Sequence, residues 1–235
     1  MPMRLLPDHR SEMVNQLLYG ESFVILDRNK NWVKITCLHD QYTGWMESDL
    51  FAPVDQNVPI KMVALSFQRF RLPEGISWLP FGSYVPDQSG TPSQNHDHLS
   101  MRDGSDKKTS LFYFKRKFLG APYLWGGRTA MGIDCSGLSQ LFMRFLGLNI
   151  PRDASQQVET GMEVFQEDVQ AGDLAFFSSE SERISHVGII QDKSKIFHAS
   201  GNVRTDFWDG AGIRRQPSGS LTHHLKTIRR IIIPH

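Results

Sequence analysis

This 235-residue chain has only two cysteines, no long apolar run and a formal net charge of just +1. Cys37 and Cys135 are too few and too far apart to form the framework of a small disulfide-rich domain. The near-neutral charge gives no reason to expect nucleic acid or a membrane as a partner. No apolar stretch is long enough for a transmembrane helix, and prolines and charged residues follow Met1, so we expect no signal peptide.

These absences favour a cytoplasmic location, where a reactive thiol stays reduced. A periplasmic or exported protein whose signal had been removed would look the same, so that alternative stays open. The length suits one to two domains and is sufficient to bury a sizeable core.

The segment Asp134-Cys135-Ser136-Gly137 stands at the start of a predicted helix. Apolar residues follow it at helical spacing: Leu138, Leu141, Phe142, Phe145 and Leu146. Asp134 suits the N-cap position, and Gly147 suits the C-terminal end. Cys135 would then lie in the first turn, where the helix dipole and free backbone N–H groups favour the nucleophilic thiolate. The alternative interpretation is a small buried cysteine without a chemical role.

Three short segments rich in β-branched and aromatic residues are predicted to be strands: residues 172–177, 185–190 and 195–199. The second carries His186 and the third carries His198. A three-residue turn would pair Gly188 with His198 and put His186 on the diagonal, so that both imidazoles share one face. One imidazole could then face the thiol while the other orients it, as in cysteine hydrolases. The alternative is two ordinary strand histidines.

Six sequence blocks, in order, resemble those of the NlpC-type cell-wall peptidases, which are papain-like enzymes that cut amide bonds in peptidoglycan peptides. The blocks are Tyr123-x-Trp125-Gly126-Gly127, Asp134-Cys135-Ser136-Gly137, Ile150-Pro151-Arg152-Asp153, Gly172-Asp173-Leu174, His186-Val187-Gly188-Ile189 and His198-Ala199. The resemblance covers residues 109–235 and implies an α+β fold. In that fold the helix carrying the cysteine packs on an antiparallel sheet.

Residues 1–52 resemble the bacterial SH3-like modules, small β-barrels that are often fused to such peptidases. The matching features are Leu17-Leu18-Tyr19-Gly20, a strand around Trp32 and the pair Gly44-Trp45. Residues 53–108 are predicted to form a second, degenerate SH3-like module or a β-rich linker, with a polar loop at residues 87–97.

Two histidines of that loop, His96 and His98, could bind a metal, but a solvated loop is preferred because a zinc site wants three or four ligands. No role is predicted for the remaining histidines, which are His9, His39, His223, His224 and His235.

The resemblance also implies roles for individual residues. Cys135 would be the nucleophile, His186 its base and His198 the residue that orients the base. Tyr123 would be a second oxyanion donor beside the backbone N–H of the cysteine, and Trp125 would wall the cleft.

Further residues are implied to bind substrate: Asp134, Ser136, Arg152 and Asp153 in the peptidase domain, and Glu21 and Tyr42 in the first module. The last two would read a substrate ammonium group, although ordinary turn chemistry is an alternative for both. Family members often have a serine after the aspartate of the Arg-Asp pair, where this chain has Ala154.

The predicted function is hydrolysis of the γ-D-glutamyl–diamino acid bond in short murein peptides with a free N-terminal L-alanine, in cell-wall recycling. The diamino acid would be meso-diaminopimelate or lysine. The alternatives are a wall-anchored hydrolase of intact peptidoglycan, an amidase of the same fold and a non-catalytic binder of murein peptides. We expect a murein-derived peptide as partner, a monomer, and no cofactor or metal.

Overall fold

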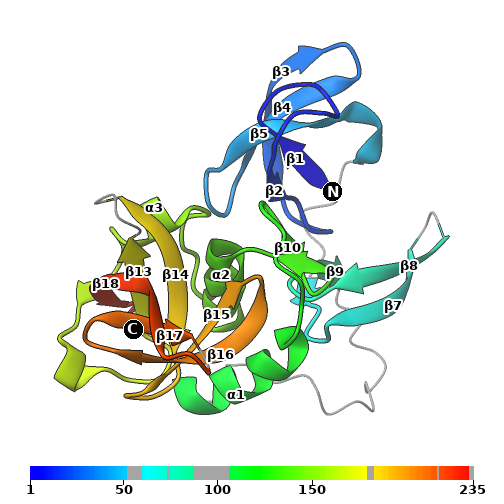
Figure 1. Ribbon diagram of the computed structural model, residues 1–235. Helices are drawn as coiled ribbons and strands as arrows, with labels where there is room; N and C mark the ends of the chain where they lie inside the picture. Colours follow the sequence, from blue (N-terminus) through cyan, green and yellow to red (C-terminus); the bar gives the residue numbers. More distant parts are fainter. Residues whose placement is uncertain (52–59, 73–74, 87–105, 179–182, 216, 233–235) are drawn as a thin grey trace.

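The computed structural model describes residues 1–51, 60–72, 75–86, 106–178, 183–215 and 217–232. The predicted loop at residues 87–97, with His96 and His98, lies outside the described residues. Figure 1 shows the N-terminal strands at the top, a large sheet at the lower left and a smaller β region at the right. Among the helices of the described residues, none is long and apolar enough to cross a membrane.

The N-terminal region, called the first region below, is a five-stranded antiparallel sheet with the order β2-β1-β5-β4-β3. Its strands are β1 (Pro2–Arg4), β2 (Met13–Gln16), β3 (Phe23–Asn29), β4 (Trp32–Cys37) and β5 (Thr43–Glu47), and the turn η1 (Ser48–Leu50) follows. Residues alternate along β4, so that Val33, Ile35 and Cys37 are buried while their neighbours are only half-buried. The sequence did not predict β1, because proline and arginine interrupt its short apolar pattern.

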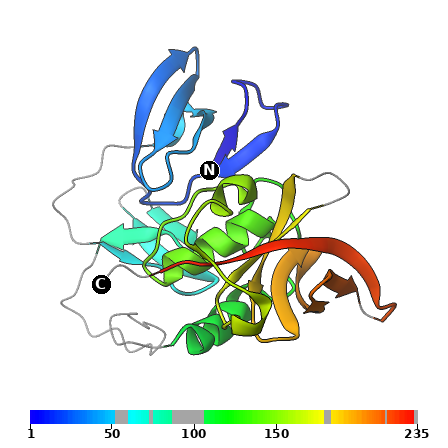
Figure 2. The same ribbon diagram turned by 90° about the vertical axis from the view of Figure 1, so that its left-hand side faces the viewer.

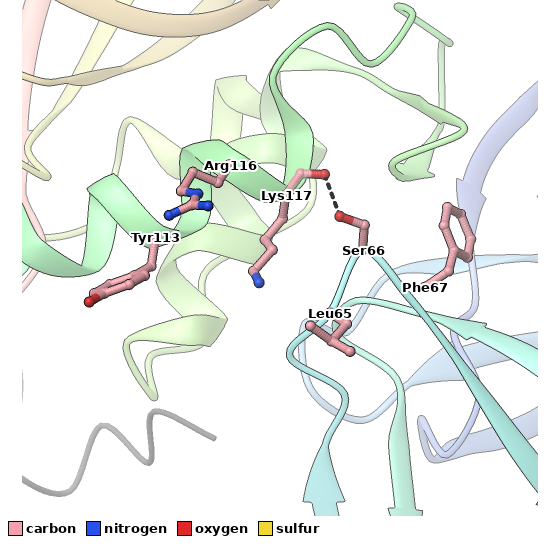
Figure 3. Close-up of a pocket in the computed structure, with 6 residues that line it drawn as sticks. All are labelled: Leu65, Ser66, Phe67, Tyr113, Arg116 and Lys117. Atoms are coloured by element: carbon pink, nitrogen blue, oxygen red, sulfur yellow. Dashed lines mark hydrogen bonds between the residues drawn. The ribbon is translucent and has the colours of Figure 1, made fainter. Parts of the chain in front are cut away.

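The described middle region contains two separate antiparallel pairs. The pairs are β6 (Ile60–Met62) with β9 (Tyr84–Pro86), and β7 (Phe67–Leu72) with β8 (Gly75–Pro80). The hydroxyl of Ser66 donates to the carbonyl of Lys117 at 2.9 Å, which ties this region to the following helix (Figure 3). The described strands of this region form two pairs and not a five-stranded sheet like that of the first region. The second SH3-like module therefore stays a prediction.

The C-terminal region combines three helices with a seven-stranded antiparallel sheet of order β12-β18-β13-β14-β15-β16-β17, in which β17 also pairs with β18. The helices are α1 (Lys107–Phe118), α2 (Cys135–Phe145) and α3 (Ala154–Gln157), with a turn η3 (Gln166–Asp168). The strands are β12 (Met162–Glu163), β13 (Leu174–Ser178), β14 (Ile184–Ile190), β15 (Lys195–Ser200), β16 (Asn202–Asp209), β17 (Gly212–Arg215) and β18 (Ser220–Arg230), and a small pair, β10 (Arg128–Thr129) with β11 (Gly132–Ile133), precedes α2.

Helix α2 packs against the strands that carry the two predicted active-site histidines. Leu138, Leu141 and Phe142 share one core with Val187 of β14 and Phe197 of β15, and each is at most 1% exposed. The helix begins where its sequence predicts, because the Asp134 carboxylate caps it by accepting from the Gly137 amide at 2.7 Å. It ends before Gly147, whose φ of +78° favours glycine. The predicted strands of this region are likewise present, as β13, β14 and β15.

Candidate active site

Cys135 is the first residue of α2, and the residue is only 6% exposed. Burial raises the pKa of its thiol to about 12, Asp134 adds to the rise, and backbone N–H groups of Val187 and Ser136 oppose it. This corrects our expectation of a thiolate: the cost of desolvating a charged sulfur outweighs the favourable field at the helix start. The thiol is therefore protonated near neutral pH and needs a base in order to react.

His186 and His198 meet on one face of the sheet. Ile189 pairs with Phe197 across β14 and β15, and this register places Gly188 opposite His198. The Nε2 atom of His186 lies 2.8 Å from Nδ1 of His198. The diagonal arrangement predicted from the turn is thus present, and both rings are buried.

Both imidazoles have a pKa below the ordinary value of histidine. Burial lowers the pKa of His186 well below 6.5, and the neighbouring His198, His223 and Arg204 lower it further. Burial also lowers the pKa of His198, although Asp206 opposes this change. His186 is therefore neutral at neutral pH and able to accept a proton.

Asp206 on β16 is a site residue that the sequence analysis missed. Its Oδ2 atom lies 3.2 Å from Nε2 of His198 and accepts a hydrogen bond from Nε of Arg204 at 2.7 Å. β15 and β16 are antiparallel with Ile196 opposite Asp206, which puts the carboxylate on the diagonal from His198. The signal in the sequence was the alternation of Arg204 and Asp206 in the strand after His198, but finding it requires the register of a third strand.

His223 on β18 is the second residue that the sequence analysis missed, because we predicted no role for it. Its ring centroid lies 4.3 Å from that of His186, with the planes tilted by 33°. β13 lies between β14 and β18, and its Phe177 pairs with His186 on one side and with Leu225 on the other. This pairing brings together two histidines that are far apart in the sequence.

Asp134, the residue before the cysteine, forms a buried ion pair with Arg152. Arg152 donates from Nη1 to Asp134 Oδ1 at 3.0 Å and from Nη2 to Oδ2 at 2.6 Å. It also donates to the hydroxyl of Ser136 at 2.8 Å and from Nε to Asn15 of the first region at 2.8 Å. Four of its five N–H donors are thus used within the protein, and these residues support the start of α2.

Tyr42 of the first region and Asp153 lie beside this pair. Burial raises the pKa of Tyr42 to about 12, and Asp153, Asp134 and Glu12 add to the rise. Burial also raises the pKa of Asp153, in part against the effect of Arg152. These two predicted substrate-binding residues therefore lie in one polar environment.

Tyr123 packs against the core that contains Cys135, and Trp125 follows two residues later. Burial raises the pKa of the Tyr123 hydroxyl, and Cys135 adds to the rise. Trp125 is 58% exposed, and its Nε1 donates to the carboxylate of Glu12 at 2.5 Å. At Gly126 a Cβ would lie 2.4 Å from the carbonyl oxygen of Met13, so this turn packs tightly on the first region.

Glu21 does not have the environment predicted for it. Its side chain is 1% exposed and accepts hydrogen bonds from Arg128 at 2.9 and 3.0 Å, from Arg144, and from the Leu18 amide at 2.7 Å. Burial alone would raise its pKa, but Arg128 and Arg144 lower it to about 2. This corrects the predicted role in ammonium binding: Glu21 is a buried ionic contact between the first region and the C-terminal one.

The fold brings a buried thiol at the start of α2 into the same core as Val187, the neighbour of His186 on β14. No group of three or more His, Cys, Asp or Glu side chains suited to hold a metal ion occurs within the described ranges. A thiol at a helix start, together with a neutral imidazole from the adjoining strand, can perform acyl transfer at a carbonyl carbon.

Two regions of the chain match known protein families. Residues 120–222 match the model of the NlpC/P60 family, and residues 3–50 match that of the bacterial dipeptidyl-peptidase Sh3 domain. A gamma-D-glutamyl-L-lysine dipeptidyl-peptidase from Bacillus subtilis (strain 168) is 44% identical over 84 residues, which are 35% of this chain and 28% of that protein. A protein of the same name from Bacillus cereus is 26% identical over 231 residues, which are 80% of this chain and 68% of that protein.

A solved NlpC/P60 family protein from Bacillus cereus shares the fold. Its TM-score is 0.70 at 21% identity, over 93% of this chain and 82% of that chain. Of the two dipeptidyl-peptidases, the match covers little more than a quarter of the Bacillus subtilis protein and about two thirds of the Bacillus cereus protein.

Proposed function

We propose that this chain, in which an NlpC/P60 domain follows a bacterial Sh3 domain, is a cysteine peptidase of peptidoglycan peptides. Its substrates would be short murein peptides with a free N-terminal L-alanine, cut between γ-D-glutamate and the diamino acid. The observation that carries the proposal is that the buried Cys135 thiol interacts with the backbone N–H of Val187, the residue after His186 on β14, while Nε2 of the neutral His186 lies 2.8 Å from Nδ1 of His198.

The reaction would proceed through a thioester. His186 takes the proton of the Cys135 thiol as the sulfur attacks the γ-glutamyl carbonyl carbon, and the resulting imidazolium then protonates the leaving amine. Water next attacks the thioester while His186 accepts a proton from that water. The C–S bond then breaks, His186 returns the proton to the Cys135 sulfur, and the released dipeptide loses the proton of its new carboxyl group to solvent. General-base activation fits the raised pKa of this thiol better than a thiolate formed in advance.

Two donors would stabilise the oxyanion. The backbone N–H of Cys135 lies at the start of α2, where amides have no partner within the helix. The Tyr123 hydroxyl is the second candidate, since its raised pKa keeps it protonated and able to donate. Trp125 would cover one side of the substrate, as predicted from the sequence.

Recognition of the substrate ammonium would fall to Glu12 rather than to Glu21. Glu12 is exposed, bonds Trp125, and is one of the charges that act on Tyr42. An exposed carboxylate that also acts on a tyrosine hydroxyl suits an ammonium group, and a charge-assisted bond of this kind contributes roughly 1.5–3 kcal/mol. Two relatives are named gamma-D-glutamyl-L-lysine dipeptidyl-peptidase, and a dipeptidyl-peptidase needs a site for the N-terminal end of its substrate, which supports this proposal.

The test compares L-Ala-γ-D-Glu-L-Lys with its N-acetylated form. We expect Glu12→Gln to lower kcat/KM for the free peptide by about 10- to 100-fold, because each 1.4 kcal/mol is a factor of ten, and to change little for the acetylated peptide. Glu47→Gln is the control, since Glu47 is another carboxylate of the N-terminal region and pairs with His9 at 3.0 Å. Equal cleavage of both peptides, or of intact glycan-linked wall, by the wild type would replace this proposal with a wall-anchored hydrolase.

A further inference from the structure

The hydrogen-bonded pair of His186 and His198 continues to Asp206 and Arg204, and we call these four residues the polar row. Asp206 accepts at one oxygen, Oδ2, from Nε of Arg204 at 2.7 Å, and the same oxygen lies 3.2 Å from Nε2 of His198. The Asp206 carboxylate is 6% exposed, so solvent competes little for these contacts. Although burial opposes ionisation, the bonds from His198 and Arg204 lower the pKa of Asp206, so it is an anion at neutral pH.

An ionised carboxylate can only accept hydrogen bonds, and this fixes the protons of both rings in turn. Nε2 of His198 must carry a hydrogen, because it faces that carboxylate. In a neutral ring Nδ1 of His198 is then an acceptor, so the bond of 2.8 Å to His186 is donated by Nε2 of His186. The remaining nitrogen of His186, Nδ1, is left with a free lone pair.

We propose that Asp206 is a positioning residue that selects one tautomer in both histidines and thereby makes Nδ1 of His186 the base. The proposal deepens the proposed peptidase function and rests on it for its kinetic part. When His186 Nδ1 takes the thiol proton, its ring becomes an imidazolium and its Nε2 hydrogen still points at His198. The negative charge of Asp206, which is separated from His186 by the ring of His198, then stabilises the His186 imidazolium.

Other charged and titratable groups also face the two rings. Arg204 acts on both, and His223 from β18 stacks against His186 and also faces His198 at a centroid distance of 6.0 Å. Burial, together with His198 and Arg204, lowers the pKa of His223 to about 4, so it is neutral above that pH. Asp206 is thus the group that supplies negative charge to this row.

The first experiment needs neither a substrate nor a variant. In protein labelled with ¹⁵N in histidine, long-range ¹H–¹⁵N spectra near neutral pH report which ring nitrogen carries the hydrogen. We expect the Nε2–H form for both His186 and His198. An Nδ1–H form of His198, or an even mixture, overturns the proposal whatever the enzyme does with peptides, so this result is separate from the proposed function.

The second experiment uses Asp206→Asn, with Asp209→Asn as the matched control. Asp209 lies on the same strand but pairs with Arg214 at 2.9 Å, at the surface. We expect Asp206→Asn to mix the tautomers of His198 and to lower kcat by about 10- to 100-fold, with a smaller change in KM, by analogy with losses at residues that orient a reactive group. Asp209→Asn should leave the His198 tautomer and kcat unchanged. Unchanged tautomers and kcat in a folded Asp206→Asn protein would contradict the role of Asp206.

Discussion

At the scale of single residues, the proposed chemistry depends on the Cys135 thiol and the His186 imidazole, which are both buried and both neutral near pH 7. The thiol of Cys135 has a raised pKa and the imidazole of His186 a lowered one, and burial is the largest cause of each. The sequence predicted which residues meet, because the motif and the strand spacing are local features. The sequence did not predict that the pKa of the Cys135 thiol is raised, because the desolvation of the thiol depends on how β14 and β15 pack around it.

The pH profile follows from the direction of the His186 shift. A base acts only when unprotonated, and a lowered pKa keeps His186 unprotonated to lower pH than an ordinary histidine. We therefore expect the acid limb of kcat/KM to lie below 6.5, the ordinary value for histidine. A pH series with a peptide substrate measures it. An acid limb at or above 6.5 would mean that His186 is more exposed, or less affected by His198 and His223, than the structure shows.

At the scale of elements, the helix and the histidine hairpin were predictable, whereas β16 to β18 were not. The period of α2 and the turn between β14 and β15 can be read from neighbouring residues. The positions of Asp206 and His223 depend on pairings between strands that are distant in the sequence, and one sequence does not specify such pairings. The role of Glu21 was misassigned for the same reason, since its partners Arg128 and Arg144 lie more than a hundred residues away.

The hairpin itself can be tested at Gly188. A Cβ there would lie 2.6 Å from Cδ1 of Ile196 and 3.1 Å from Cβ of His198. Gly188→Ala should therefore cost about 1–3 kcal/mol of stability through overpacking, and shift His198 as well. We expect a lower unfolding midpoint together with a fall in kcat/KM.

The matched variant is the double change Gly188→Ala with Ile196→Val, which removes the Cδ1 atom nearest to the new methyl group. It should recover part of both the stability and the activity. If Gly188→Ala alone leaves stability and kcat/KM unchanged, then β14 and β15 do not pack as closely as described.

At the scale of the whole molecule, ion pairs and hydrogen bonds join the first region to the C-terminal one, and the two parts lie side by side in Figures 1 and 2. Glu21 binds Arg128 and Arg144, Asn15 binds Arg152, and Asp40 accepts from Gln140 at 2.9 Å. Arg152 in turn holds the cap of the cysteine helix. The first region is therefore part of the support of the active site.

Glu21→Gln tests this interface. It keeps the shape but leaves two buried guanidinium groups unpaired, so we expect a loss of about 3–5 kcal/mol. Because the pKa of Glu21 is lowered to about 2, its contribution is present above its ordinary value of 4.5 and disappears as the pH falls from 4.5 towards 2. Unfolding midpoints of wild type and variant should thus differ at pH 7 and converge in acid.

Glu47→Gln is the control for this comparison, because its pair with His9 is largely exposed and should contribute little. A Glu21→Gln protein as stable as wild type at pH 7 would contradict the assignment of Glu21 to the interface.

The central claim is that Cys135 cleaves the γ-D-glutamyl bond, and the most direct test is a mass analysis of products. L-Ala-γ-D-Glu linked to L-lysine or to meso-diaminopimelate is incubated with the wild type, with Cys135→Ala and with Cys37→Ala, all shown to be folded by thermal unfolding. We predict L-Ala-γ-D-Glu and the free diamino acid from the wild type and from Cys37→Ala, and intact peptide from Cys135→Ala. Turnover by Cys135→Ala, or cleavage at any other bond, would contradict the account.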